Sequence, residues 1–183
     1  MNFYLRKIYK RGVNMATEYI NVFNKNSKEY YNYITNEIKK ANENGKKTAL
    51  FVCDTYFPTY DGVVNVFEAY AKGLMANGYN VFAFVPAFCD KVYIKSCPVI
   101  AAKSVFSKKL NYQVPIPAFD FKAKKLLKSL KIDVIHCHSP FFMGQYALKL
   151  HKKRKIKMVA TFHSQYKQDL KKNTNSNFLT NLL

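Results

Sequence analysis

Residues 132–165 read IDVIHCHSPFFMGQYALKLHKKRKIKMVATFHSQ, and this stretch decides the fold class. Two short apolar runs, at 132–137 and 157–162, flank a segment with helical spacing at 141–152. This strand–helix–strand order is typical of a parallel sheet, in which ligands bind at the carboxyl ends of the strands. Both runs end on histidines and are followed by small or polar residues, so we expect a functional site at this edge of the sheet.

The same alternation begins earlier in the chain. Residues 48–53, TALFVC, form a continuous apolar run, as in a strand covered on both faces. Apolar residues at helical spacing predict a helix over 63–76, which Asn77 and Gly78 can end. Further elements are expected as strands at 81–86 and 98–102, a basic and aromatic loop over 103–117, and a helix over 119–131. The sequence therefore predicts an α/β fold with a Rossmann-like parallel sheet and helices on both faces.

The predicted helix over 119–131 is amphipathic, with one apolar face for the sheet. The residues expected on that face are Phe119, Ala123, Leu126, Leu127 and Leu130.

Residues 1–46 differ in composition from the rest and are rich in Tyr, Asn and Lys. Loosely helical spacing predicts one or two amphipathic helices that end near Asn44 and Gly45. We expect this segment to be a helical N-terminal extension outside the sheet, and residues 47–183 to form the Rossmann-like domain. A further, interrupted helix is expected over 164–183.

The chain of 183 residues carries 30 basic and 11 acidic side chains, a net charge of +19. This excess favours an anionic partner: a phosphorylated substrate, an anionic membrane surface or nucleic acid. Nucleic acid is the least favoured, because the basic run at 152–157 comes with no aromatic stacking motif and no helix-turn-helix pattern. The loop with Val105, Phe106 and Leu110 suits a non-catalytic basic module that binds anionic membrane surfaces. Solvated lysine faces are the alternative for any single cluster.

The cysteines and the apolar runs indicate where in the cell the protein is located. The four cysteines show no CxxC spacing, and Cys53 and Cys137 lie in apolar runs as small buried hydrophobes. The N-terminus lacks the apolar core of a signal peptide, and no apolar run approaches the roughly 20 residues that span a bilayer. These features predict a cytoplasmic protein with at most peripheral membrane contact.

The loop PTYDGV, residues 58–63, is the first candidate site. A glycine here lets the backbone approach an anion, and the N-terminus of the next helix offers free N–H groups and a positive dipole end. The loop is neither a GxGxxG nor a Walker motif. On spacing alone, a tight turn that binds nothing is the alternative.

The histidines are the second candidate. On a strand, His136 and His138 would point to one face and Cys137 to the other. Such a pair suits zinc if His163 or Asp54 supplies a third ligand. We favour instead one core histidine and one site-facing histidine, and predict no metal site. His163 at a strand end can hydrogen-bond to a sugar hydroxyl or phosphate, or shuttle a proton, with a packing role as the alternative.

Three segments of the chain together resemble the family 4-like glycosyltransferases of GT-B fold. Residues 54–86, DTYFPTYDGVVNVFEAYAKGLMANGYNVFAFVP, are similar to their opening βα unit. Residues 132–150 and 158–166, IDVIHCHSPFFMGQYALKL and MVATFHSQY, are similar to the segments DVIHxHSPxxxGxxAL and TFHS/T. The resemblance covers about residues 48–170 and is closest to members that glycosylate lipids such as diacylglycerol.

The resemblance implies a retaining transferase with two Rossmann-like domains. A sugar would pass from a nucleotide-sugar donor to a lipid or glycan acceptor, with no metal or other cofactor. The N-terminal domain mainly receives the acceptor and the C-terminal domain holds most of the donor. That second domain, with its Glu-x7-Glu motif, is absent from this sequence. We therefore expect one half of a GT-B fold, inactive alone and in need of a complementing donor domain, at the inner face of the membrane.

The resemblance also implies residue roles. Gly62 matches a glycine whose backbone N–H approaches the donor diphosphate, and Asp61 stands where many members have another glycine. His163 matches the active-site histidine near the transferred sugar and is the expected catalytic residue. The HSP segment at 138–140 matches one that lines the crevice. The expected substrate-binding residues are Asp61, Gly62, Val63, His138 and Ser139.

Overall fold

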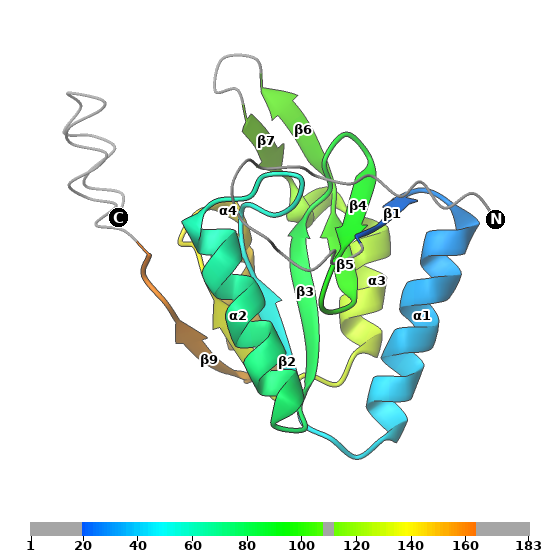
Figure 1. The fold of residues 1–183 in the computed structure, drawn as a ribbon, viewed down its shortest axis with the longest axis vertical. Helices are drawn as coiled ribbons and strands as arrows, with labels where there is room; N and C mark the ends of the chain where they lie inside the picture. Colours follow the sequence, from blue (N-terminus) through cyan, green and yellow to red (C-terminus); the bar gives the residue numbers. More distant parts are fainter. Residues whose placement is uncertain (1–19, 108–111, 164–183) are drawn as a thin grey trace, which may run out of the picture.

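The computed structural model describes residues 20–107 and 112–163. Its centre is a five-stranded parallel sheet with strand order β5-β3-β2-β8-β9 (Figure 1). The strands are β2 (Thr48–Val52), β3 (Asn80–Pro86), β5 (Val99–Ala102), β8 (Val134–Cys137) and β9 (Lys157–Ala160). All five residues of β2 are buried, as expected for a strand at the centre of the sheet with helices over both faces. The predicted Rossmann-like α/β class is confirmed.

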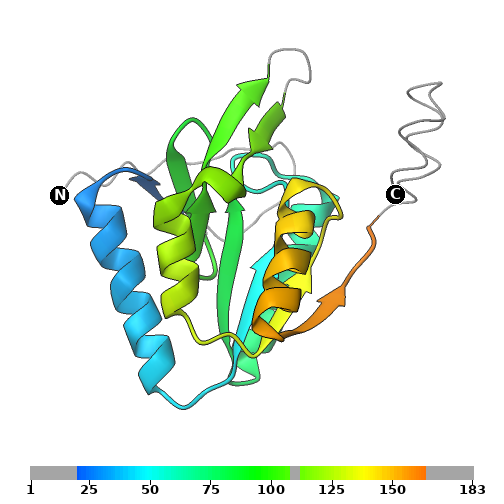
Figure 2. The same ribbon diagram turned by 180° about the vertical axis from the view of Figure 1, so that it is seen from behind.

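Helices cover both faces of this sheet (Figures 1 and 2). On one face lies α2 (Gly62–Ala76), and on the other lie α3 (Phe121–Ser129) and α4 (Phe142–Arg154), with α1 (Lys28–Glu43) beside α3. Each helix runs back from the carboxyl edge, so the helix N-termini gather where the parallel strands end. The helices predicted over 63–76 and 141–152 are confirmed within two residues at each end.

The described part of the N-terminal segment forms one short strand and one helix. Helix α1 begins at Ser27, whose hydroxyl accepts the Tyr30 N–H, and ends at Asn44, before Gly45 with a φ of 72°. The predicted helix end near Asn44 and Gly45 is therefore confirmed. Strand β1 (Asn21–Asn24) lies in the segment predicted to be helical, and it pairs with β4 (Lys91–Ile94) in a separate antiparallel sheet. The prediction for residues 1–19 lies outside the described residues.

Helix α1 packs on the edge of the domain through buried side chains. The Tyr30 hydroxyl donates to the carbonyl of Val99 and accepts the N–H of Ala101, both at 2.9 Å. These bonds satisfy backbone groups of β5, which is the edge strand of the central sheet within the described residues. The buried face of the helix consists of Tyr30, Ile34, Ile38 and Ala41.

A buried ion pair ties this segment to α3. The Lys25 ammonium lies 2.6 Å from a carboxylate oxygen of Asp120, and both side chains are buried. Asp120 is the N-cap of α3 and accepts the Ala123 N–H. Burial alone would raise the pKa of the Asp120 carboxyl, but the Ala123 hydrogen bond and the Lys25 charge outweigh burial and lower the pKa.

The prediction of a loop over residues 103–117 was wrong for this segment. It contains an antiparallel hairpin of β6 (Ser104–Ser107) and β7 (Tyr112–Pro115) that projects beyond the carboxyl edge of the sheet (Figure 1). Each strand has four residues, and neither carries the alternating apolar pattern that marks a half-buried strand. Cross-strand pairing forms the hairpin, and local sequence does not reveal such pairing.

The buried position predicted for Phe119 was also wrong, because its side chain is 73% exposed. Asp120 caps the helix, so Phe119 precedes the first turn and belongs to the 3-10 helix η1 (Pro117–Phe119). The rest of the predicted face, which is Ala123, Leu126, Leu127 and Leu130, is buried. The helix predicted over 164–183 lies outside the described residues.

Candidate functional site

The candidate site lies at the carboxyl edge of the central sheet, where β2, β8 and β9 end side by side. The residues that follow these strands are the loop to α2, the turn to α4 and residues 161–163. Three segments far apart in the sequence therefore meet at one edge, as expected from a parallel strand order.

Asp54, directly after β2, organises the turn between β8 and α4. Its carboxylate accepts the Met143 N–H at 2.9 Å and the Ser139 hydroxyl at 2.5 Å, and its own N–H donates to the Ser139 oxygen. Phe141, the N-cap of α4, has no polar side chain, so Asp54 caps this helix from the loop after β2. Burial raises the pKa of Asp54, although these hydrogen bonds act in the opposite direction.

This arrangement bears on Ser139, one of the predicted substrate-binding residues. Ser139 is 7% exposed, and its hydroxyl is engaged with Asp54 as both donor and acceptor. Its geometry is therefore that of a residue that holds the site together beneath the surface. The sequence also gave no sign that Asp54 would contact Ser139, 85 residues away.

Gly144 permits the close approach of α4 to this turn. A Cβ atom at Gly144 would lie 2.1 Å from the Ser139 carbonyl oxygen and 3.2 Å from the Cys137 sulfur. The glycine of the segment HSPFFMG is thus required by packing between backbone segments.

His136 in β8 and His138 just after β8 both face α2, as predicted from strand geometry. His136 stacks on Tyr70 of α2, while Cys137 points to the α4 side. The His136 Nε2 lies 2.7 Å from the Thr161 hydroxyl, and the His136 and His138 ring centroids lie 4.2 Å apart. The alternation therefore places both histidines on one face of the sheet.

His138 is completely buried and lies beneath the edge of the sheet. Its ring packs against Phe51 and Phe67, each with a centroid distance of 5.1 Å. The Nδ1 of His138 lies 3.0 Å from the Nε2 of His163, at hydrogen-bond distance. His138 thus reaches the crevice through His163, whereas we expected it to line the crevice.

His163 extends from the end of β9 and is half-buried. Burial lowers its pKa, and the nearby Asp61 carboxylate acts in the opposite direction. Asp61 is the N-cap of α2, so the structure brings together two features that the sequence predicted separately. His163, His138 and the start of α2 form one site.

The start of α2 remains open to a ligand. The Asp61 side chain accepts the Val64 N–H at 2.9 Å, which leaves the N–H groups of Gly62 and Val63 ahead of it at the helix terminus. Asp61 and Gly62 are exposed, and a methyl group at Gly62 would meet no atom of the other described residues within 4 Å. The start of α2 therefore lies at the surface of the part of the chain that the structure describes.

The histidines of the site are neutral at pH 7. Burial, together with the neighbouring His136 and His163, lowers the pKa of His138 to about 3. Burial also lowers the pKa of His136. Within residues 20–107 and 112–163, no group of three or more His, Cys, Asp or Glu side chains is arranged to hold a metal ion.

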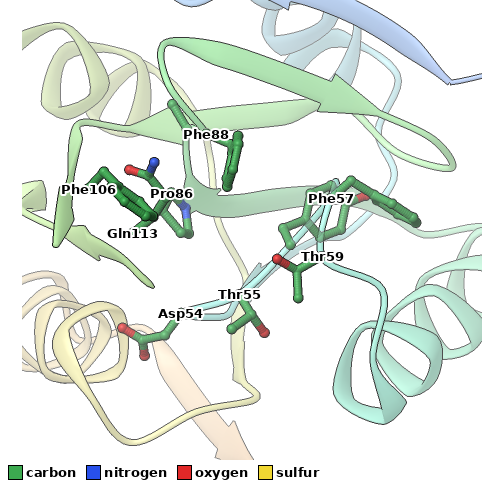
Figure 3. Close-up of a pocket in the computed structure, with 10 residues that line it drawn as sticks. Asp54, Thr55, Phe57, Thr59, Pro86, Phe88, Phe106 and Gln113 are labelled. Carbon is green, nitrogen blue, oxygen red and sulfur yellow. The ribbon is translucent and has the colours of Figure 1, made fainter. Parts of the chain in front are cut away.

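A small pocket of about 60 Å³ adjoins the site between the loop after β2, the end of β3 and the hairpin (Figure 3). Gln113 in the hairpin accepts the Ser104 hydroxyl at 2.9 Å, which fixes the amide at the pocket wall. Sequence reasoning missed this pocket because it predicted no hairpin. The lining residues are Asp54, Thr55, Tyr56, Phe57, Thr59, Pro86, Ala87, Phe88, Phe106 and Gln113.

These features define a Rossmann-like domain whose strand-end histidines meet an open helix N-terminus. Residues 60–183 match Glycosyltransferase Family 4, and the chain belongs to this family. The described helices include none long and apolar enough to cross a membrane.

Two relatives are similar over 114 residues, or 62% of the chain. They are the alpha-monoglucosyldiacylglycerol synthases of Acholeplasma laidlawii, 29% identical, and Streptococcus pneumoniae (strain ATCC BAA-255 / R6), 28% identical. The matched segment spans 29% and 26% of their respective lengths. No solved structure is significantly similar to the chain.

Proposed function

We propose that this chain forms the acceptor side of a retaining glycosyltransferase that moves a sugar from a nucleotide-sugar donor to a lipid acceptor. The contact of His163 with His138 beside the N-cap of α2, in a family 4 domain, carries this proposal. It gathers a hydrogen-bonding imidazole and an anion-binding helix end at one edge of the sheet.

In this proposal the N-terminus of α2 stabilises the donor diphosphate. Negative charge grows on the diphosphate as its bond to the sugar C1 breaks, and the N–H groups of Gly62 and Val63 favour that charge. The acceptor hydroxyl oxygen forms the new bond to C1 on the same face, and its proton passes to the departing diphosphate. His163 hydrogen-bonds to the transferred sugar and orients it. No cofactor besides the nucleotide-sugar is proposed.

A lipid acceptor is supported by the relatives and by the pocket. Both relatives are named for the synthesis of monoglucosyldiacylglycerol. The pocket beside the site combines the Thr55 and Thr59 hydroxyls with the apolar walls of Phe88 and Phe106. At about 60 Å³, the pocket suits only the hydroxyl-bearing end of such an acceptor. A glycan acceptor is the alternative within the same reaction.

A donor-binding domain completes the site in this proposal. The matched segment spans less than a third of each relative, so further sequence or a second chain would supply the donor domain. Such a domain would close over the carboxyl edge and exclude water from the reaction.

The test is transfer from radiolabelled UDP- and GDP-sugars to lipid vesicles, with the chain alone and with a complementing donor domain. We expect transfer only with both parts, and its loss in His163→Ala. The matched control is His151→Asn, because His151 lies on α4 and bonds to the Ile156 carbonyl away from the site. Unchanged turnover in His163→Ala would remove the catalytic role, and no transfer in any pairing would refute the proposed activity.

A second candidate function is a non-catalytic basic module on anionic membranes. The observation that favours it is a set of exposed apolar side chains among lysines, in the hairpin and at the start of α3. Phe121 is 78% exposed, and Val105 is 55% exposed. With a net charge of +19, such side chains suit peripheral contact with anionic lipid at the cytoplasmic face of a membrane.

Vesicle sedimentation separates this function from the first. We expect tighter binding to vesicles with anionic lipid than to neutral ones, with added salt weakening the binding. Equal binding to both kinds of vesicle would remove the electrostatic argument. If the chain binds membranes but transfers no sugar, alone or with a donor domain, the non-catalytic membrane module would be favoured over the enzyme.

A further inference from the structure

The hydrogen bond between His138 and His163 joins a fixed ring to a half-exposed one. His138 is completely buried, and its backbone N–H donates to the Val52 carbonyl of β2 at 2.8 Å. Phe51 and Phe67 pack on its ring. His163 stands at the end of β9, and the plane of its ring lies at 15° to that of His138. His138 is therefore the rigid member of the pair and His163 the member that depends on it.

We propose that His138 is a positioning residue that fixes the orientation and the tautomer of His163. This inference rests on the proposed function, in which His163 hydrogen-bonds to the transferred sugar. It adds a defined role for a residue that cannot itself reach a substrate.

The geometry also selects the tautomer. Only one of the two nitrogens that face each other, His138 Nδ1 and His163 Nε2, carries a hydrogen when both rings are neutral. The other nitrogen of His138, Nε2, is buried and has no hydrogen-bond partner among the described residues. A buried N–H without an acceptor is rarer in proteins than a buried acceptor without a donor. The hydrogen of His138 therefore lies on Nδ1 and is donated to His163.

This assignment determines what His163 offers to a substrate. With Nε2 occupied as an acceptor, a neutral His163 carries its hydrogen on Nδ1, so Nδ1 becomes a hydrogen-bond donor. A neutral histidine in water carries its hydrogen mainly on Nε2, so the pair reverses the usual preference. The low pKa of His138 supports the assignment, because His138 stays neutral and keeps a single donor at pH 7.

The first test is a two-bond ¹H–¹⁵N correlation spectrum of the ¹⁵N-labelled full chain at pH 7. The chain has four histidines, and His151→Asn identifies one that lies outside the site. We expect His163 to show a protonated Nδ1 and a bare Nε2. A His163 that carries its hydrogen mainly on Nε2 would overturn the inference.

Two variants test the dependence on His138. His138→Phe keeps an aromatic ring without the donor, and we expect His163 to return to the Nε2–H form. His138→Asn places an amide N–H near the position of Nδ1, and we expect it to retain the Nδ1–H form. An unchanged His163 tautomer in His138→Phe would overturn the inference. If His138→Phe does not fold, the wild-type and His138→Asn spectra still decide.

Kinetics with a complementing donor domain separate this inference from the proposed function. We expect His138→Phe to lower kcat roughly 10- to 100-fold, as for a misplaced catalytic group, with His138→Asn recovering most of the loss. Wild-type kcat in His138→Phe would overturn the positioning role while the function stands. If His163 shows the expected tautomer but no combination of chain and donor domain transfers sugar, the proposed function is refuted. The contact between the two histidines then still stands.

Discussion

Gly62 is the residue at which structure and proposed function are most easily separated. Beyond its chain neighbours, no atom of the described residues lies within 4 Å of a Cβ placed there, so we expect the fold to tolerate alanine. We expect Gly62→Ala to change the free energy of unfolding by less than about 0.5 kcal/mol. The methyl group would nevertheless obstruct a diphosphate at the start of α2, so KM for the donor should rise. Urea unfolding and transfer kinetics check the two parts, and an unchanged KM would contradict the role of Gly62.

Asp54 has the opposite character, because its contacts are with the protein itself. We expect Asp54→Ala to lower the free energy of unfolding by about 2 kcal/mol or more, because the Met143 N–H and the Ser139 hydroxyl lose their buried acceptor. Asp54→Asn retains an acceptor and avoids a buried charge, so its loss should be smaller. Urea unfolding of both variants measures the difference, and equal stability of Asp54→Ala and wild type would refute the capping role.

At the scale of elements, α4 approaches the turn after β8 closely at Gly144. We expect Gly144→Ala to lower the free energy of unfolding by about 2 kcal/mol or more, because its Cβ meets the Ser139 carbonyl and the backbone must move. Gly73 in α2 is the matched control, since a Cβ there meets nothing within 4 Å. Gly73→Ala should raise the stability by about 0.5–1 kcal/mol. Losses of equal size in both would contradict the packing argument.

The ion pair of Lys25 and Asp120 links elements in a different way. It joins the turn between β1 and α1 to the N-cap of α3, so residues from the N-terminal segment and the Rossmann-like domain share one buried contact. Taking two charges out of water costs free energy, which their attraction offsets only when the geometry is good and further hydrogen bonds are made. Asp120 meets this condition, because it also accepts the N–H groups of Lys103 and Ala123.

At the scale of the whole molecule, the histidines make stability depend on pH. The folded-state pKa of His138 is about 3, whereas an unfolded histidine has a pKa near 6.5. Below pH 6.5 the unfolded chain therefore binds protons that folded His138 does not, and stability falls as the pH falls. For this one residue we expect a loss of about 2 kcal/mol between pH 7 and pH 5.

Urea unfolding at pH 7 and pH 5 measures this loss, and His138→Phe isolates it. Asp54 contributes in the opposite sense, because burial raises its pKa, so the difference between wild type and variant is the relevant quantity. The variant should lose less stability than the wild type over this interval. An equal loss would show that His138 is not held neutral by the fold.

Local patterns in the sequence determined the class of the sheet, the bounds of most elements and the face on which each β8 side chain lies. These properties follow from periodicity: two residues for a strand and 3.6 for a helix. The strand-end position of His163 and the helix-start position of Gly62 could be predicted for the same reason. The resemblance of three segments then pointed to the family, which the match over residues 60–183 confirmed.

The tertiary structure alone decided which of these residues touch. It placed Asp54 on Ser139 across 85 residues and His138 on His163 across 25, and it formed the hairpin that walls the pocket. Such contacts depend on strand order and on cross-strand pairing, which leave no local period in the chain. Side chains at strand ends are therefore predictable as candidates, but their hydrogen-bond partners follow only from the neighbours that the folded sheet gives them.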